Sequence, residues 1–119
     1  MKLEDLITKS YTDLEQSKRL AKILSDETAD FFWLIGRLHT DGPRYEVIRT
    51  RNEVSEPETC WPCWSLAALL DYLSANFRVD IKYLNNYWEL DCRVQVTYGK
   101  ELVDACYEMI IKLHEQKLL

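Results

Sequence analysis

The sequence predicts an α+β fold of two layers, in which a four-stranded, mainly antiparallel sheet carries the helices on one face. Three observations point to this class. In three segments the apolar residues recur at steps of three and four, the period of an amphipathic helix. Within residues 77–98 they alternate with polar residues, as in strands with one buried and one wet face. Turn-forming residues separate these runs, which gives the order α-β-β-α-β-β-α in a single globular domain over 1–119.

The first helical pattern lies near the N-terminus. Thr12 and Glu15 have the spacing of a capping box, in which a hydroxyl accepts a hydrogen bond from the first helical turn. We therefore expect a short leading turn of helix and then a main helix over about 13–24, which the polar stretch SDETAD ends. The apolar residues of this pattern are Leu3, Leu6, Ile7, Tyr11, Leu14, Ala21 and Leu24.

Two β-prone segments follow and predict a hairpin. FFWLIGRL, residues 31–38, is rich in aromatic and branched residues, and RYEVIRTR, residues 44–51, is the expected return strand. TDGP between them supplies turn chemistry. NEVSEPE, residues 52–58, reads as an acidic loop.

A second helix, a second hairpin and a last helix are expected in the second half of the chain. Ser65 is a candidate N-cap for a helix whose buried face is Leu66, Leu69, Leu70 and Leu73. Residues 77–83 and 88–98 alternate as two strands, and Asn85 and Asn86 are expected in the turn between them, since Asn tolerates positive φ. The expected apolar face of the second strand is Trp88, Leu90, Cys92, Val94, Val96 and Tyr98. Gly99 ends the second strand. The last helix has the apolar residues Leu102, Ala105, Cys106, Met109, Ile110 and Leu113.

The stretch TCWPCWSLAALL, residues 59–70, contains a C-x-x-C pair before a helix. A redox pair needs this position because the helix dipole lowers the thiol pKa. However, the predicted neighbours are hairpins rather than a βαβ unit, and no proline follows Pro62 to form the cis-Pro loop of thioredoxin-like folds. We prefer a structural interpretation, in which Pro62 and Ser65 fix the start of the helix, Trp64 packs beneath it and the thiols are incidental.

A zinc site needs four ligands. The available residues are Cys60, Cys63, Cys92, Cys106, His39 and His114. The second close pair that makes such sites convincing is missing, because 13 residues separate Cys92 from Cys106. Both also fall on apolar faces, where a free cysteine behaves as a small hydrophobic residue. We therefore expect them in the core.

Charge and composition exclude several functions. The chain of 119 residues has a formal net charge of -5 and a pI of about 5.0. Phosphate backbones are bound by clustered Lys and Arg, so we expect no nucleic-acid partner. The first residues include Glu4 and Asp5 and lack an apolar run, so we expect no secretory signal, and no segment approaches the ~18 apolar residues of a membrane span. We expect a cytoplasmic protein without membrane contact and with reduced cysteines.

Few other residues suggest a site. Three scattered glycines cannot form a phosphate-binding loop, and no serine has a recognisable base. Arg44, Arg49 and Arg51 lie near Tyr45 and are candidate contacts for an acidic ligand, although charges that protect an edge strand explain them equally well. Some of the four Trp and seven Tyr should be exposed, as on protein-binding surfaces, while most belong in the core.

Four short motifs carry a resemblance that covers most of the chain. They are QSKRL at 16–20, TAD at 28–30, PCWSL at 62–66 and DACYEM at 104–109. With them the chain resembles a group of small uncharacterised proteins from bacteriophages and mobile elements of gut bacteria, with the pattern QSKxL, TAD, PxWSL, DAxxEM. In that group the residue between Pro and Trp is usually small and not a cysteine, so Cys63 departs from it and a redox role is disfavoured. The group has no established activity, so the resemblance implies an origin and no mechanism.

The sequence thus leads us to expect a non-enzymatic phage or mobile-element accessory protein that acts through protein–protein binding. The expected partner is a host or phage protein, or a second copy of the chain. The alternative hypothesis is a thiol-redox or metal-binding module that uses Cys60 and Cys63. We expect no cofactor. The candidate binding or thiol positions are Cys60, Cys63, Trp61, Trp64, Arg49 and Arg51.

Overall fold

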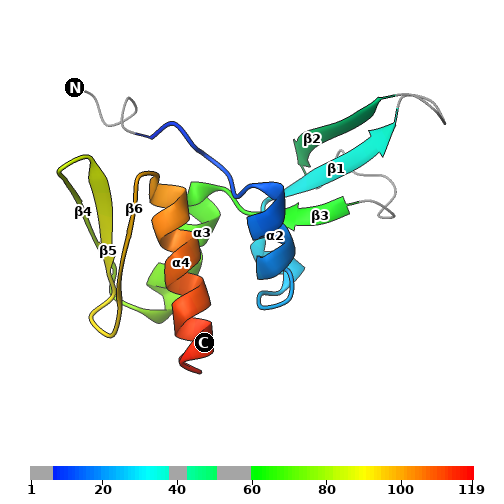
Figure 1. Cartoon of the computed structure of the whole chain (residues 1–119). Helices are drawn as coiled ribbons and strands as arrows, with labels where there is room; N and C mark the ends of the chain where they lie inside the picture. The colour runs from blue at the N-terminus through cyan, green and yellow to red at the C-terminus, as the bar shows by residue number, and fades with distance from the viewer. Residues whose placement is uncertain (1–6, 38–42, 51–59) are drawn as a thin grey trace.

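Helices and antiparallel strands share the chain, which confirms the α+β class (Figure 1). A computed structural model describes residues 7–37, 43–50 and 60–119. The elements in chain order are α2 (Leu14–Leu20), the 3-10 turn η1 (Asp26–Thr28), β1 (Phe31–Arg37), β2 (Arg44–Thr50), β3 (Cys60–Cys63), α3 (Leu66–Asn76), β4 (Asp80–Leu84), β5 (Tyr87–Asp91), β6 (Val96–Gly99) and α4 (Leu102–Glu115).

The strands form two sheets rather than one. The prediction of a single four-stranded sheet is wrong, because the strands pair as β2-β1-β3 and β4-β5-β6, each a three-stranded antiparallel sheet. Figure 1 shows the two sheets on opposite sides of the helices. The additional strand β3 comes from the C-x-x-C motif, which pairs with β1 so that Trp61 lies opposite Trp33. The predicted order therefore lacked two strands, β3 and β6.

The sheet β4-β5-β6 and the helices enclose the main core. The amphipathic helix α4 packs on the inner face of this sheet, where Leu90 and Thr97 are opposed and buried. The predicted apolar faces of α3 and α4 are confirmed at their centres by Leu69, Leu73, Cys106 and Met109, all 0% exposed. Further members of this core are Leu20, Leu24, Ala29, Trp64, Trp88, Cys92, Leu102, Val103, Ala105, Tyr107, Ile110, Ile111 and Leu113.

A tight turn divides the predicted strand 88–98 into β5 and β6. The N–H of Cys92 donates to the carbonyl of Gln95 at 3.1 Å, and Arg93 between them has a φ of 73°. The carboxylate of Asp91 accepts from the Arg93 N–H at 2.7 Å, which stabilises this left-handed conformation. The turn reverses the alternation of faces. Val94, which we expected in the core, is 55% exposed.

The first helix begins one residue later than predicted and is shorter. Its capping box consists of Asp13 and Gln16, not Thr12 and Glu15. Thr12 is fully buried and its hydroxyl accepts from the N–H of Trp64 at 3.2 Å, so it is not available as a cap. The expected leading turn of helix is absent from residues 7–10, and residues 3–6 lie outside the described part of the chain.

The turn between β4 and β5 is confirmed. Asn85 and Asn86 have φ values of 55° and 67°, and they join Leu84 to its antiparallel partner Tyr87. Positive φ at both central residues is the geometry that matches the twist of a two-residue hairpin, and Asn adopts it more readily than most residues.

The exposure of Val94 and the burial of Leu69 give a direct test of this fold. Leu69→Ala should lower the free energy of unfolding by about 2–5 kcal/mol, because it removes a fully buried side chain and leaves a cavity. Val94→Ala is the control and should change it by less than about 0.5 kcal/mol. Urea denaturation of both variants measures this. Equal destabilisation would show that residues 88–98 form one continuous strand after all.

Candidate functional site

The C-x-x-C motif lies on a strand and does not begin a helix. In β3, Cys63 is opposite Phe31 and Cys60 is opposite Leu34. Residues three apart on a strand point to opposite faces of the sheet. Cys60 and Cys63 therefore do not face each other, whereas a dithiol pair or a shared metal needs both sulfurs on one side.

The environment of the two thiols also disfavours reactivity. Burial raises the pKa of Cys63 to about 11, although hydrogen bonds from Thr12 and Ser17 partly oppose it. Burial likewise raises the pKa of Cys60 above its usual value. The reactive form of cysteine is the thiolate, and reactive cysteines have lowered pKa values. Neither residue has the electrostatics of a redox nucleophile.

The segment after the motif has the structural role that we predicted. Trp64 is 0% exposed, and its indole N–H donates to the hydroxyl of Thr28 at 2.9 Å. Ser65 caps α3 by accepting from the N–H of Ala68 at 3.1 Å. Asp30 adds a contact that the sequence did not reveal, since its carboxylate accepts from both the backbone N–H and the hydroxyl of Ser65. Ser65 therefore bonds to Asp30 and to the first turn of α3 at the same time.

The remaining candidate positions do not converge on one site. Trp61 is half-buried, and the ammonium of Lys18 lies 5.6 Å from the centre of its ring. Arg49 is exposed on β2 and donates to the carbonyl of Ile48. Arg51 and His39 lie outside the described residues.

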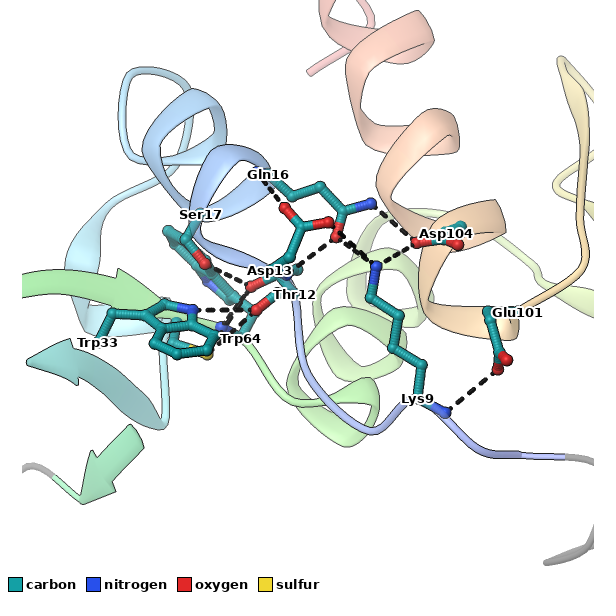
Figure 2. A network of polar contacts seen from close by, with 10 residues as sticks. Lys9, Thr12, Asp13, Gln16, Ser17, Trp33, Trp64, Glu101 and Asp104 are labelled. Atoms are coloured by element: carbon teal, nitrogen blue, oxygen red, sulfur yellow. Dashed lines mark hydrogen bonds and ion pairs between the residues drawn. The ribbon is translucent and has the colours of Figure 1, made fainter. Parts of the chain in front are cut away.

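A polar network joins the N-terminal segment to α2 and α4 (Figure 2). The ammonium of Lys9 contacts the carboxylates of Asp104 at 2.7 Å and Asp13 at 3.2 Å, and the side-chain oxygen of Gln16 at 3.0 Å. Gln16 also donates to Asp104 at 2.8 Å, while the backbone N–H of Lys9 donates to Glu101. The ammonium of Lys9 thus joins the start of α2, next to it in sequence, to α4, which is distant in sequence.

The network does not provide a catalytic base. Partial burial by itself lowers the pKa of Lys9, but the hydrogen bonds and charges of Asp104 and Asp13 outweigh it, so the pKa lies above its usual value. A lysine that acts as a base or nucleophile needs a lowered pKa. Lys9 stays charged at neutral pH and acts as a structural cation.

A second cluster in Figure 2 contains hydroxyls and a thiol without a general base. The hydroxyls of Thr12 and Ser17 lie 2.7 Å apart, and the thiol of Cys63 donates to the carbonyl of Thr12 at 3.6 Å. A nucleophile of this kind is activated by an adjacent base. Of the two histidines, His114 lies in the described ranges. It is exposed near the end of α4 and is not among these contacts. The contacts of this cluster connect the start of α2 to β3.

Within residues 7–37, 43–50 and 60–119, no three side chains of His, Cys, Asp or Glu gather so that they could hold a metal ion. In the same part of the chain, no helix has the length and apolar character required to cross a bilayer.

A hollow of about 530 Å³ lies between η1 and α3. Its lining includes the methyl groups of Ala67 and Ala75 and the polar side chains of Thr28 and Asp30. Both polar side chains already have structural partners, because Thr28 donates to the carbonyl of Ser25 and accepts from Trp64, and Asp30 holds Ser65. The chemistry of this hollow is largely that of the α3 cap.

The outer face of the sheet β4-β5-β6 carries the most exposed aromatic side chains. Leu84 is 64% exposed, Tyr98 61% and Tyr87 46%. These three residues line a hollow of about 490 Å³ together with Asn85 and Glu89. We call the residues whose side chains alternate away from α4 the outer β4–β6 face. They are Asp80, Lys82, Leu84, Tyr87, Glu89, Asp91, Val96 and Tyr98.

Sequence reasoning missed this surface because of the turn at Arg93. A continuous strand over 88–98 placed Tyr98 on the same apolar face as Leu90, and the turn moves it to the opposite face. One signal was available. Leu84 and Tyr87 immediately flank the Asn85–Asn86 turn, where large apolar side chains are not needed by the core.

Comparison of the chain with protein-family models, with curated proteins and with solved structures finds no match. A function is therefore inferred from the described residues themselves.

The thiols provide a second test. In the native protein at pH 8, Cys63 and Cys106 should react with Ellman's reagent at least about a hundredfold more slowly than an exposed thiol, because burial raises their pKa to about 11 and about 12. The denatured protein is the control, in which all four thiols should react rapidly. Rapid, dithiothreitol-reversible closure of a Cys60–Cys63 disulfide in the folded protein would contradict the structural interpretation.

The Lys9 network gives a pH-dependent prediction. Lys9→Met should lower the free energy of unfolding by about 1 kcal/mol at pH 7, since a partly exposed ammonium loses two carboxylate contacts. A raised pKa in the folded state means that this stabilisation is complete below the unfolded-state pKa of 10.5 and is lost as the pH rises through the folded-state value. Urea denaturation from pH 7 to pH 11 should therefore show the two proteins converging.

The matched control for Lys9 is Lys22→Met, at an exposed lysine of the same region. It should change stability by less than about 0.5 kcal/mol at every pH. Equal effects of the two substitutions would show that the network does not stabilise the fold.

Proposed function

We propose that this chain is a non-enzymatic protein-binding module whose recognition surface is the outer β4–β6 face. The observation that supports the proposal is the exposure of Leu84, Tyr87 and Tyr98 around one hollow. Exposed apolar residues scattered singly are ordinary, but three that share a hollow form a contiguous patch. Tyrosine is enriched at the centres of protein interfaces because it offers a large apolar ring and a polar hydroxyl.

The scaffold suits this role. Both tyrosines lie on paired strands, and Leu90 and Trp88 of β5 are anchored in the core beneath them. A side chain on a packed strand loses less conformational freedom on binding than one on a loop, so more of the contact energy appears as affinity. Polar groups accompany the apolar side chains, as in typical interfaces, because Glu89 lines the hollow and Lys82 lies opposite it.

Absence of catalysis is part of the proposal. The described thiols are buried or have raised pKa values, and Lys9 is held as a cation by two carboxylates. These arrangements are the reverse of what nucleophilic or acid–base catalysis requires. The polar groups that could have formed an active site instead stabilise the junction of α2, β3 and α4.

We propose a protein partner in the cytoplasm, either of the host or of the mobile element. All four cysteines are free, which is typical of a reducing compartment. The resemblance to small phage and mobile-element proteins is the source of the host or phage assignment. A second copy of the chain is the other partner that this surface could accept.

Photo-crosslinking at a single position tests the proposal. A photoreactive phenylalanine derivative in place of Tyr98 should give a discrete covalent adduct with one protein in the native host. The same derivative at Leu118, which is 48% exposed on the C-terminal segment, is the control and should give none. The captured protein, once purified, should bind Tyr98→Ala at least about tenfold more weakly than the unmodified chain. Adducts at both positions, or at neither, would refute this surface.

A further inference from the structure

The outer β4–β6 face is too small for an extended protein–protein interface. Its strands contain four or five residues each, so the face measures about 17 Å along the strands and about 10 Å across. Stable interfaces between folded proteins bury about 800 Å² on each side. A narrow partner, such as a single extended segment, fits this face better than a folded domain or a second copy of the chain.

The polar groups around the hollow are available to such a segment. Among the described residues, the hydroxyls of Tyr87 and Tyr98 and the side-chain amide of Asn85 make no hydrogen bond that ties them to the fold. These groups are donors, and they lie on the face of a sheet rather than at its edge. A partner bound here cannot extend the sheet through its backbone, so it must present carbonyls that are not already paired.

A polyproline II helix has this property. It has no internal hydrogen bonds, and its carbonyls point outward to solvent. Every third residue returns to the same side after about 9 Å. Tyr87 and Tyr98 are diagonal neighbours, because Tyr98 is opposite Glu89, and such neighbours lie about 7–8 Å apart. Two prolines in a Pro-x-x-Pro segment would therefore each meet one tyrosine ring.

Charge favours a basic residue beside the prolines. Glu89 lines the hollow. Asp80 and Asp91 lie next to each other on the same face, where Asp80 pairs with the exposed Arg78 at 3.9 Å and Asp91 accepts from the Arg93 N–H. Lys82 is opposite Glu89 in the register, yet among the described residues the two make no ion pair. An arginine of the partner can form the charge-assisted contact that Lys82 does not make.

We propose that the outer β4–β6 face binds a proline-rich segment of a partner protein, with a Pro-x-x-Pro pair on Tyr87 and Tyr98 and an adjacent arginine on Glu89. The inference rests on the proposed protein-binding function and specifies its partner. Aromatic grooves that receive preformed proline-rich helices lose little entropy on binding, which allows a small face to be selective.

An amide-resolved NMR titration with a synthetic peptide of the pattern Arg-x-x-Pro-x-x-Pro tests this inference. Saturable shifts should be confined to residues of β4, β5 and β6, and the same peptide with both prolines replaced by alanine should leave the spectrum unchanged. Tyr98→Ala should weaken binding at least about tenfold. Tyr98→Phe should weaken it less, since it removes only the hydroxyl. Glu89→Gln should reduce the salt dependence of the affinity.

Val94→Ala, in the turn between β5 and β6 and outside the hollow, is the control and should bind the peptide like the unmodified chain. Shifts elsewhere on the protein, or equal binding of the alanine peptide, would overturn the inference. So would a dimer in sedimentation experiments whose interface covers Tyr98. If the peptide fails to bind while a photoreactive group at position 98 still captures a protein without such a segment, only the proline-rich inference falls. If the crosslink is also absent, the proposed function falls with it.

Discussion

The rest of the structure depends on the hydrogen bonds of one buried residue, Thr12. Its backbone N–H donates to the carbonyl of Trp64 at 2.9 Å, and its own carbonyl accepts from the indole of Trp33 at 3.0 Å and the thiol of Cys63 at 3.6 Å. Its hydroxyl accepts from the Trp64 N–H and pairs with Ser17. One residue thus joins β1, β3 and the start of α2. Because a buried polar group without its partner costs about 1–3 kcal/mol, these segments have a single satisfactory arrangement.

This junction explains why the two sheets have different roles. β3 passes through it directly into α3, so the sheet β2-β1-β3 is attached at one end of the helical layer, as Figure 1 shows. The other sheet lies across that layer and has α4 on its inner face. Its inner face supplies Leu90 and Trp88 to the core, and its outer face has no helix of the described chain upon it. The exposed tyrosines on that outer face are therefore outside the core.

Local signals predicted the elements better than their assembly. Ser65 and the Asn85–Asn86 turn were predictable because each depends on its own neighbours in sequence. The capping role of Asp13, by contrast, follows from the use of Thr12 by Trp64, a residue 52 positions away. The turn at Arg93 was hidden for another reason. Its residues continue the alternating pattern of a strand, and only a left-handed arginine, stabilised by Asp91, breaks it. Pairing between distant strands, such as β1 with β3, has no local signal at all.

The distribution of polar side chains is the basis of the proposed function. One thiol, two hydroxyls, a lysine and two carboxylates gather near the junction, but their hydrogen bonds are directed at one another and at the backbone. Groups that stabilise one arrangement of the chain are poorly placed to change partners during a reaction. The tyrosines of the outer β4–β6 face are in the opposite condition, because they stand on strands anchored in the core and their side chains are exposed around a hollow. Preorganised groups without an internal partner are the ones that another molecule can bind.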